Sequence, residues 1–183
     1  MLPLLIILAV VLAIALWIGA TYNGLVKKRN IVDNSYSQID VQLKQRHDLV
    51  PNLVATVKGY AAHEAGVFEQ VAEARGAAVG ASGPAAAFAA ENMLTAALGK
   101  LMAVAEAYPE LRANEGFLKL QTELGELEKK IAVSRQLYND TVLTLNNAVQ
   151  VFPNSLVASA FGFGKREFFE AEASDRAAAT VSF

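Results

Sequence analysis

An uninterrupted apolar run at the start of the chain constrains its fold more than any other feature. Residues 2–20 contain no charged and no strongly polar side chain. As a helix this stretch is about 28 Å long, close to the ~30 Å hydrocarbon core of a bilayer. A buried core helix rarely needs so long an apolar run. The sequence therefore predicts a membrane-spanning anchor over residues 1–22.

A cleaved signal peptide is the main alternative to a retained anchor. No Lys or Arg precedes the apolar run, and the run is longer than the apolar region of a usual signal peptide. Trp17 and Tyr22 stand where an interfacial aromatic belt is expected, and the basic residues 27–29 follow them. We expect a retained anchor, with the soluble domain in the cytoplasm according to the positive-inside rule.

The rest of the chain has the spacing of long amphipathic helices. Apolar residues recur at alternating steps of four and three over residues 32–71 and again over residues 117–152. This is the a/d pattern of a coiled coil or a long bundle helix. The first helix is predicted to end at Arg75, before a glycine-rich loop over residues 76–83. A weak point is predicted at Asn23-Gly24, where the bundle meets the anchor.

Proline and glycine positions set the remaining boundaries. A second helix is predicted over residues 84–107, with Tyr108 outside it because Pro109 follows. A third helix is predicted over residues 114–152, ended by Pro153, and a short one over residues 156–161. The fold class is therefore all-α, with an N-terminal transmembrane helix, an elongated antiparallel helical bundle or coiled-coil rod, and a short C-terminal helix. The predicted domains are the anchor (1–22), the bundle (23–162) and a Phe-rich tail (163–183).

Composition excludes several function classes. The net charge is −2, and no stretch combines clustered basic residues with interleaved aromatics, so nucleic acid is not an expected partner. The absence of cysteine removes disulfides and thiol chemistry. His47 and His63 lie roughly 160° apart around a helix and cannot share a metal along one face. No nucleotide-binding or nucleophile motif occurs, so we expect neither catalysis nor a cofactor.

Polar residues interrupt the seam of the first predicted helix, that is, its series of a and d positions. Arg46 and Glu64 occupy positions that the pattern reserves for apolar side chains, and Asp48 and Pro51 lie close to Arg46. One interpretation is a bend at Pro51, with the freed carbonyl near His47 satisfied by water or a side chain. The other is that Arg46 and Glu64 set register or partner choice through groups on another helix or another chain.

The C-terminal segment is unusually rich in phenylalanine and too short to build its own core. Either these rings fold back onto the exposed stripe of the bundle, or they dock on a neighbouring subunit. The residues concerned are Phe161, Phe163, Phe168, Phe169 and Phe183.

Two long stretches resemble the LemA family of bacterial membrane proteins. The first is YNGLVKKRNIVDNSYSQIDVQLKQRHDLVPNLVATVKGYAAHE, and the second is ELEKKIAVSRQLYNDTVLTLNNAVQVFPNSLVASAFGF. The resemblance implies a bacterial inner-membrane protein with long antiparallel helices. It also implies no established enzymatic activity and no catalytic residues. By analogy it favours a membrane-organising role.

The leading hypothesis is a membrane-anchored scaffold that self-associates as a homo-oligomer and organises membrane or recruits other membrane proteins. Ala15 and Gly19 form a small-xxx-small pair that would let two anchors pack closely, although such pairs are common by chance. The alternative is a monomeric adaptor or accessory subunit of another membrane enzyme, such as a protease. An enzyme with an unrecognised site is the third reading.

Overall fold

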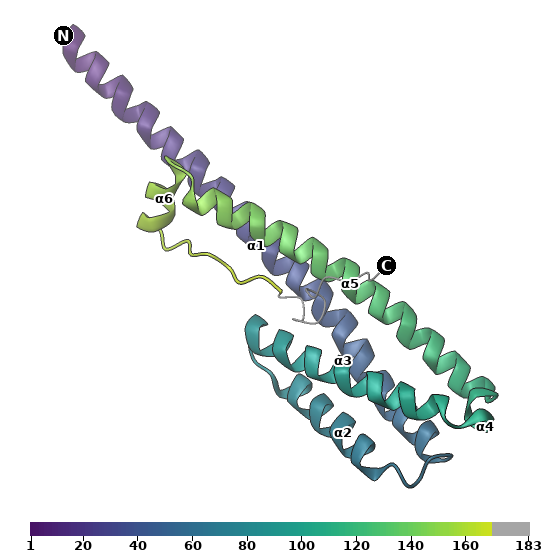
Figure 1. Cartoon of the computed structure of the whole chain (residues 1–183). Coiled ribbons are helices and arrows are strands. Elements are labelled where there is room, and N and C mark those ends of the chain that lie inside the picture. The colour runs from purple at the N-terminus through teal and green to yellow at the C-terminus, as the bar shows by residue number, and fades with distance from the viewer. Residues whose placement is uncertain (170–183) are drawn as a thin grey trace, which may run out of the picture. The chain divides into compact units, whose positions relative to one another are not determined.

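Residues 1–169 are described by the computed structural model of this chain, and most of them are α-helical (Figure 1). No strand occurs in this range, so the predicted all-α class with an apolar N-terminal helix and a helical bundle is confirmed. Part of the predicted tail, including Phe183, lies outside the described residues. The helices in the described range are α1 (Leu2–Lys58), α2 (Ala65–Gly80), α3 (Pro84–Glu106), α4 (Pro109–Arg112), α5 (Glu115–Gln150) and α6 (Asn154–Ala160).

Helix α1 contains both the predicted anchor and the first bundle helix. Helix α1 continues without a break through Asn23-Gly24, which the sequence marks as a weak point. One glycine costs a helix only about 1 kcal/mol relative to alanine, and the neighbouring Leu25 is buried by packing. Every large apolar side chain over residues 2–16 is more than half exposed. Within the described residues, α1 alone is long and apolar enough to cross a membrane.

The first predicted bundle helix is interrupted, contrary to the sequence pattern. It was expected to continue to Arg75, but α1 ends at Lys58 and α2 begins at Ala65. Gly59 lies at the exit, and the N–H groups of the next two residues close the turn on the carbonyl of Val57 at 3.0 and 2.9 Å. The apolar spacing continues through this turn, so spacing alone does not reveal it. Side chains from both sides of the turn enter one core: Leu53, Val57, Ala61, Phe68 and Val71.

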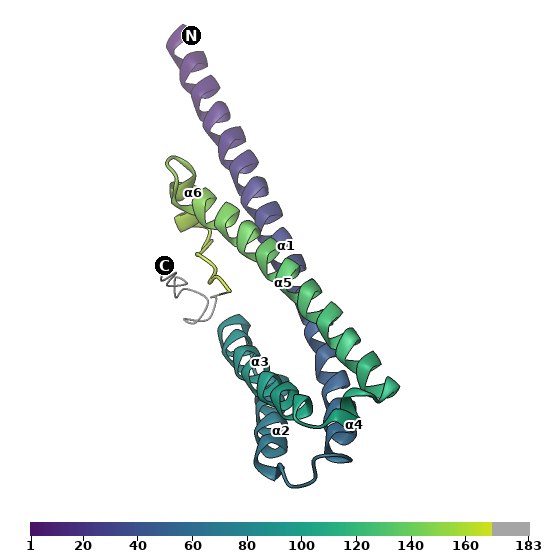
Figure 2. The same ribbon diagram turned by 45° about the vertical axis from the view of Figure 1, so that its right-hand side comes forward.

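The loop predicted over residues 76–83 is mostly helix. Helix α2 continues to Gly80, and only residues 81–83 connect it to α3, which lies beside it in both views (Figures 1 and 2). Alanine is the strongest helix former, and the buried Ala74 and Ala78 belong to the same apolar core as α3. Gly83 has a φ of 84°, a conformation that favours glycine, and it directly precedes α3.

The other boundaries that were predicted agree with the structure to within two residues, whereas the short helix α4 was not predicted. Tyr108 is extended (φ −114°, ψ 95°) and separates α3 from α4, as the following proline requires. Helix α5 ends at Gln150, slightly before the predicted end at Phe152. Gly162, with a φ of 71°, follows α6 and ends it.

Two compact units divide the described chain, and each takes part of α1 and part of α5. The first unit holds residues 1–37 and 136–168, and the second holds residues 38–135 together with Phe169. The division into domains at residues 22 and 162 stays a prediction. The first unit buries Leu25, Val32, Tyr138, Val142, Leu145, Val149, Val157 and Phe163. The second buries a larger set that includes Leu49, Leu53, Phe68, Leu94, Leu101, Leu111, Phe117 and Leu127.

Candidate functional site: a buried ion cluster and an aromatic cluster

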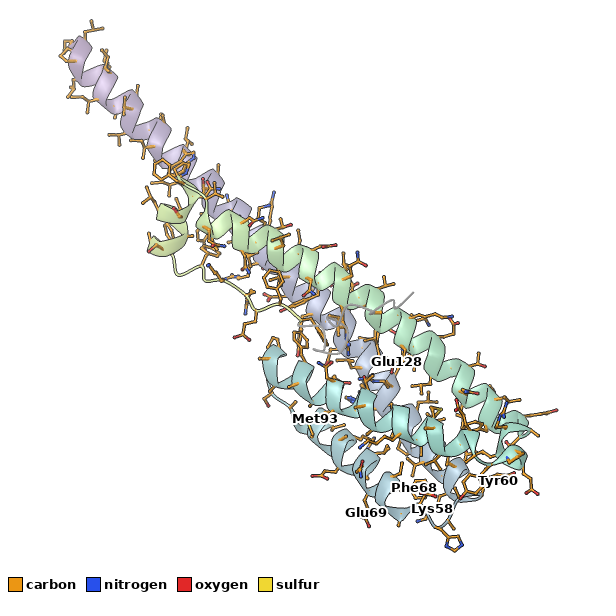
Figure 3. All side chains as sticks on the ribbon, in the orientation of Figure 1. Lys58, Tyr60, Phe68, Glu69, Met93 and Glu128 are labelled. Atoms are coloured by element: carbon orange, nitrogen blue, oxygen red, sulfur yellow. The ribbon has the colours of Figure 1, made fainter. Side chains whose placement is uncertain are left out.

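Arg46 lies at the centre of a buried ion cluster in the second unit. Its side chain, on α1, is completely buried and forms an ion pair with Glu91 on α3. Arg46 Nη1 also donates to Glu128 Oε1 at 2.7 Å and to Thr95 Oγ1 at 2.9 Å. Glu128 comes from α5 (Figure 3), so the guanidinium of Arg46 links α1 to two other helices, α3 and α5. The partners that the sequence required for Arg46 lie on other helices of the same chain.

Glu91 is the buried anion of this cluster, with 1% of its side chain exposed. His47 Nε2 donates to its second carboxylate oxygen at 2.5 Å. Burial raises the pKa of Glu91, but the hydrogen bond from His47 and the charge of Arg46 outweigh burial and hold that pKa below its ordinary value. The carboxylate is therefore ionised at neutral pH and offsets the buried guanidinium.

Pro51 frees a backbone carbonyl beside the cluster. A proline has no N–H, so the carbonyl four residues earlier, that of His47, loses its helical partner. Arg75 Nε donates to this carbonyl at 2.8 Å from α2. A side chain thus satisfies the freed carbonyl, as one interpretation of Pro51 required, whereas the bend at Pro51 stays a prediction; α1 is assigned as one helix through Pro51.

Asp48 and Glu64 lie away from the buried cluster. Asp48 is exposed and lines an open groove of about 520 Å³ with Leu49 and Asn52 of α1 and Glu123 and Lys130 of α5. Glu64 directly precedes α2 and is partly exposed, so its expected place in a continuous seam is wrong. The reason is the turn after Lys58, which ends the helical register that placed Glu64 in line with Arg46.

An aromatic cluster in the first unit lies beside Tyr22 of α1, just after the apolar run. The ring of Tyr22 makes edge contacts with Phe161 and Phe163, at centroid distances of 5.0 and 5.6 Å. The guanidinium of Arg29 lies 5.3 Å from the centroid of the Phe163 ring. Phe163 is buried, whereas Phe161 remains 55% exposed.

Side chains of α5 hold the extended segment that follows Phe163. The amide of Asn146 donates to the carbonyl of Arg166 at 2.9 Å and accepts from its N–H at 2.8 Å. The hydroxyl of Tyr138 donates to the carbonyl of Glu167 at 3.0 Å. Burial raises the pKa of Tyr138, so this hydroxyl stays protonated at neutral pH. Arg166 also pairs with Asp33 at 3.1 Å.

The last two candidate phenylalanines differ in burial. Phe168 is 42% exposed, whereas Phe169 is buried. In the second unit, the ring centroids of Phe169 and Phe88 lie 3.9 Å apart, and the guanidinium of Arg135 lies 4.0 Å from the centroid of the Phe169 ring. The structure thus places Phe163 and Phe169 against the chain's own helices.

Sequence reasoning missed Glu91, Glu128 and Asn146. Glu91 carried a usable signal, because it lies three residues after Phe88 and three before Leu94, on the apolar stripe of α3. An acidic residue on that stripe is the complement of the basic Arg46 on the first seam. Asn146 carries no such signal, because its partners are backbone atoms of a segment with no helical period.

The cluster has the composition of a structural ion network. Among residues 1–169, no group of three or more His, Cys, Asp or Glu side chains could hold a metal ion. Each carboxylate oxygen of Glu91 already accepts a hydrogen bond, one from Arg46 and one from His47, and the side chain is almost completely buried. Its physical role is to fix the relative positions of α1, α3 and α5.

Comparison with known proteins agrees with this architecture. A family model described as the LemA family matches residues 35–183. The chain belongs to the LemA family. This confirms the resemblance seen in the sequence. Together with the exposed apolar part of α1, it indicates a membrane-associated protein.

The curated relatives that this LemA protein matches are magnetosome proteins. Magnetosome proteins MamQ 1 and MamQ 2 of Paramagnetospirillum magneticum are each 28% identical to it over 175 residues. Magnetosome protein MamQ of Magnetospirillum gryphiswaldense is 27% identical over 174 residues. In each case the match covers 81% of this chain and 64% of the relative. The chain thus spans less than two thirds of the length of these relatives.

Proposed function

We propose that this LemA protein is a membrane-anchored helical scaffold that self-associates and organises membrane or recruits partner proteins. The observation that carries the proposal is the exposed apolar stretch of α1, which continues as a helix into the bundle. A helical scaffold attached in this way has no need of a reactive site. The names of the MamQ relatives, which refer to the magnetosome, favour a membrane-organising role by analogy.

Self-association is supported by the anchor. Apart from the backbone of its own helix, no atom of the described residues lies within 4 Å of where a Cβ on Gly19 would stand, and Ala15 is exposed one turn earlier. Two small residues four apart let a second helix approach closely in a bilayer. The basic residues 27–29 follow the anchor, so the positive-inside rule favours a cytoplasmic bundle in a bacterial inner membrane.

A monomeric adaptor or accessory subunit of another membrane enzyme is the second candidate. The observation that favours it is the ion cluster of Arg46, because Glu91 and Glu128 of the same chain satisfy this charge. A buried charge with partners in its own chain needs no second copy.

The mass of the full chain in lipid nanodiscs separates the two candidates. A scaffold gives a particle heavier than one chain per disc by light scattering, and Gly19→Ile lowers that mass. Ala13→Ile is the matched control, because position 13 lies on the opposite side of the helix. A wild-type monomer in every preparation refutes self-association and leaves the adaptor.

A further inference from the structure

An apolar surface beside the anchor is uncovered in the first unit. It comprises the turn after α5 and α6 itself, residues 151–161, and is called the α6 surface below. Val151 is 57% exposed, Phe152 75%, Leu156 61% and Phe161 55%. Four large apolar side chains exposed within one short segment are more than the scattered single residues of an ordinary protein surface.

The segment around this surface carries no charge. Between Asp140 and Lys165 the sequence contains no Asp, Glu, Lys, Arg or His. An interface with water, or with the charged rim of a partner protein, normally includes such residues. Their absence over the end of α5 and all of α6 fits an environment in which an ionised side chain is costly.

Contacts with α1 place the α6 surface level with the end of the anchor. Phe161 contacts the ring of Tyr22, which follows the last residue of the apolar run by two positions. Ile18, which belongs to the apolar run itself, is already partly buried. A residue that packs on this part of α1 lies at the depth where a bilayer changes from hydrocarbon to headgroups.

Basic and aromatic residues lie at the level of α1 where the α6 surface packs. Arg29 stacks over Phe163, directly after the α6 surface, and Lys165 and Arg166 follow within three residues. Aromatic rings at the interface, with Lys and Arg just beyond them, are the usual arrangement at a membrane boundary. The surface is therefore continuous with the membrane-contacting part of α1.

We propose that the α6 surface rests in the interfacial layer of the same phospholipid bilayer that holds the anchor. The chain then has two membrane contacts, a spanning helix and a short helix lying at the boundary. Phe152 and Leu156 contact lipid, and Phe161 lies beside Tyr22 at the interface. This inference rests on the anchor of the proposed function, but it does not depend on self-association.

Depth-dependent fluorescence quenching tests the proposal on the full chain in nanodiscs that contain only lipid and this protein. Because the sequence has no cysteine, Phe152→Cys and Leu156→Cys each accept one environment-sensitive dye at an exposed position. Leu137→Cys is the control: Leu137 is also exposed, at 46%, but lies on α5 about 20 Å along the helix from the turn. Nitroxide-labelled phospholipid is the quencher, and helix content by circular dichroism checks each variant.

Dyes at positions 152 and 156 should emit at shorter wavelength than the dye at 137 and be quenched about twofold more strongly. Trp17, the single tryptophan, reports on the anchor in unlabelled protein. If Trp17 is quenched but positions 152 and 156 behave like 137, the proposal is overturned and the anchor stands. If Trp17 is not quenched, the anchor and the proposal both fail. A blue shift at 152 without nitroxide quenching would assign the surface to a second copy of the chain and would also overturn the proposal.

Discussion

Removing the negative charge of Glu91 is the most direct test of the ion cluster. In Glu91→Gln the side chain keeps its shape but no longer offsets the guanidinium of Arg46, which has no exposed surface. The guanidinium keeps its contact with Glu128, whose side chain is 36% exposed. An anion that faces solvent in this way is screened and stabilises a buried cation less than Glu91 does.

The expected loss of stability follows from these contacts. Removing one partner of a buried ion pair costs about 3–5 kcal/mol, and the remaining contact with Glu128 reduces this to about 2–4 kcal/mol. Glu128→Gln should cost about 1 kcal/mol or less, because the Glu128 carboxylate itself faces solvent and is screened. The double variant Arg46→Met with Glu91→Leu removes both charges and restores an apolar seam. The unfolding free energy that the double variant loses should be smaller than the sum of the losses in its two single variants.

Urea unfolding of the full chain in mild detergent, followed by helical circular dichroism at neutral pH, measures these differences. Glu126→Gln is the control, because this carboxylate lies at the surface and pairs only with exposed lysine. Its transition should match that of the wild type. If Glu91→Gln unfolds within about 0.5 kcal/mol of the wild type, the cluster contributes little to stability. The assignment of Glu91 as the principal counter-charge of Arg46 would then be wrong.

Three further measurements examine the acid response, the proline site and the extended segment. Because the folded-state pKa of Glu91 is lowered, the ionised carboxylate contributes to folding stability above about pH 4.5, and this contribution is lost as the pH falls through the folded pKa. The unfolding free energy of Glu91→Gln should therefore decline less steeply with falling pH than that of the wild type. Acid titration followed by circular dichroism would show the difference. Arg75→Met should lower the unfolding free energy by about 1–3 kcal/mol, because it leaves the His47 carbonyl, which Pro51 frees, without its hydrogen bond. The same substitution should lower the unfolding free energy less in a Pro51→Ala background, because residue 51 then supplies an N–H to that carbonyl. Asn146→Leu removes both hydrogen bonds to the backbone of Arg166, so limited trypsin digestion should cut there faster than in the wild type; equal rates would contradict the assigned role.

The helical class could be predicted because apolar periodicity and proline positions are local signals. Pro84, Pro109 and Pro153 each lie at or next to a helix end, and the seam of α5 consists of side chains that pack as its spacing requires. The break after Lys58 could not be predicted, because the same apolar spacing continues on both sides of it. Whether such a pattern folds as one helix or two depends on what the second half can pack against. Here that surface is α3, which lies later in the sequence.

The candidate site was predicted in part for a similar reason. Arg46 was recognisable because a charge in an apolar seam is costly without a partner, but the pattern does not specify whether that partner is in the same chain. The tertiary structure supplies Glu91 from α3 and Glu128 from α5. Glu64 was misplaced because its assignment depended on a continuous helix. The segment after α6 has no period, so only the fold shows that Asn146 and Tyr138 bind its backbone.

The burial of Arg46 within its own chain affects where the contacts between copies of a self-associating scaffold should be sought. A charged residue in an apolar helix seam indicates a second chain only if its own chain offers no counter-charge. For Arg46, Glu91 of the same chain supplies that counter-charge. Substitution of Arg46 is therefore expected to destabilise the bundle, and any loss of oligomer in such a variant would not identify an interface. The small-residue face at Ala15 and Gly19 remains available, because within residues 1–169 no other segment approaches within 4 Å of where a Cβ on Gly19 would stand. If the protein assembles, we expect Gly19→Ile to lower its mass while helix content and unfolding stay unchanged, a combination that loss of the ion cluster cannot produce.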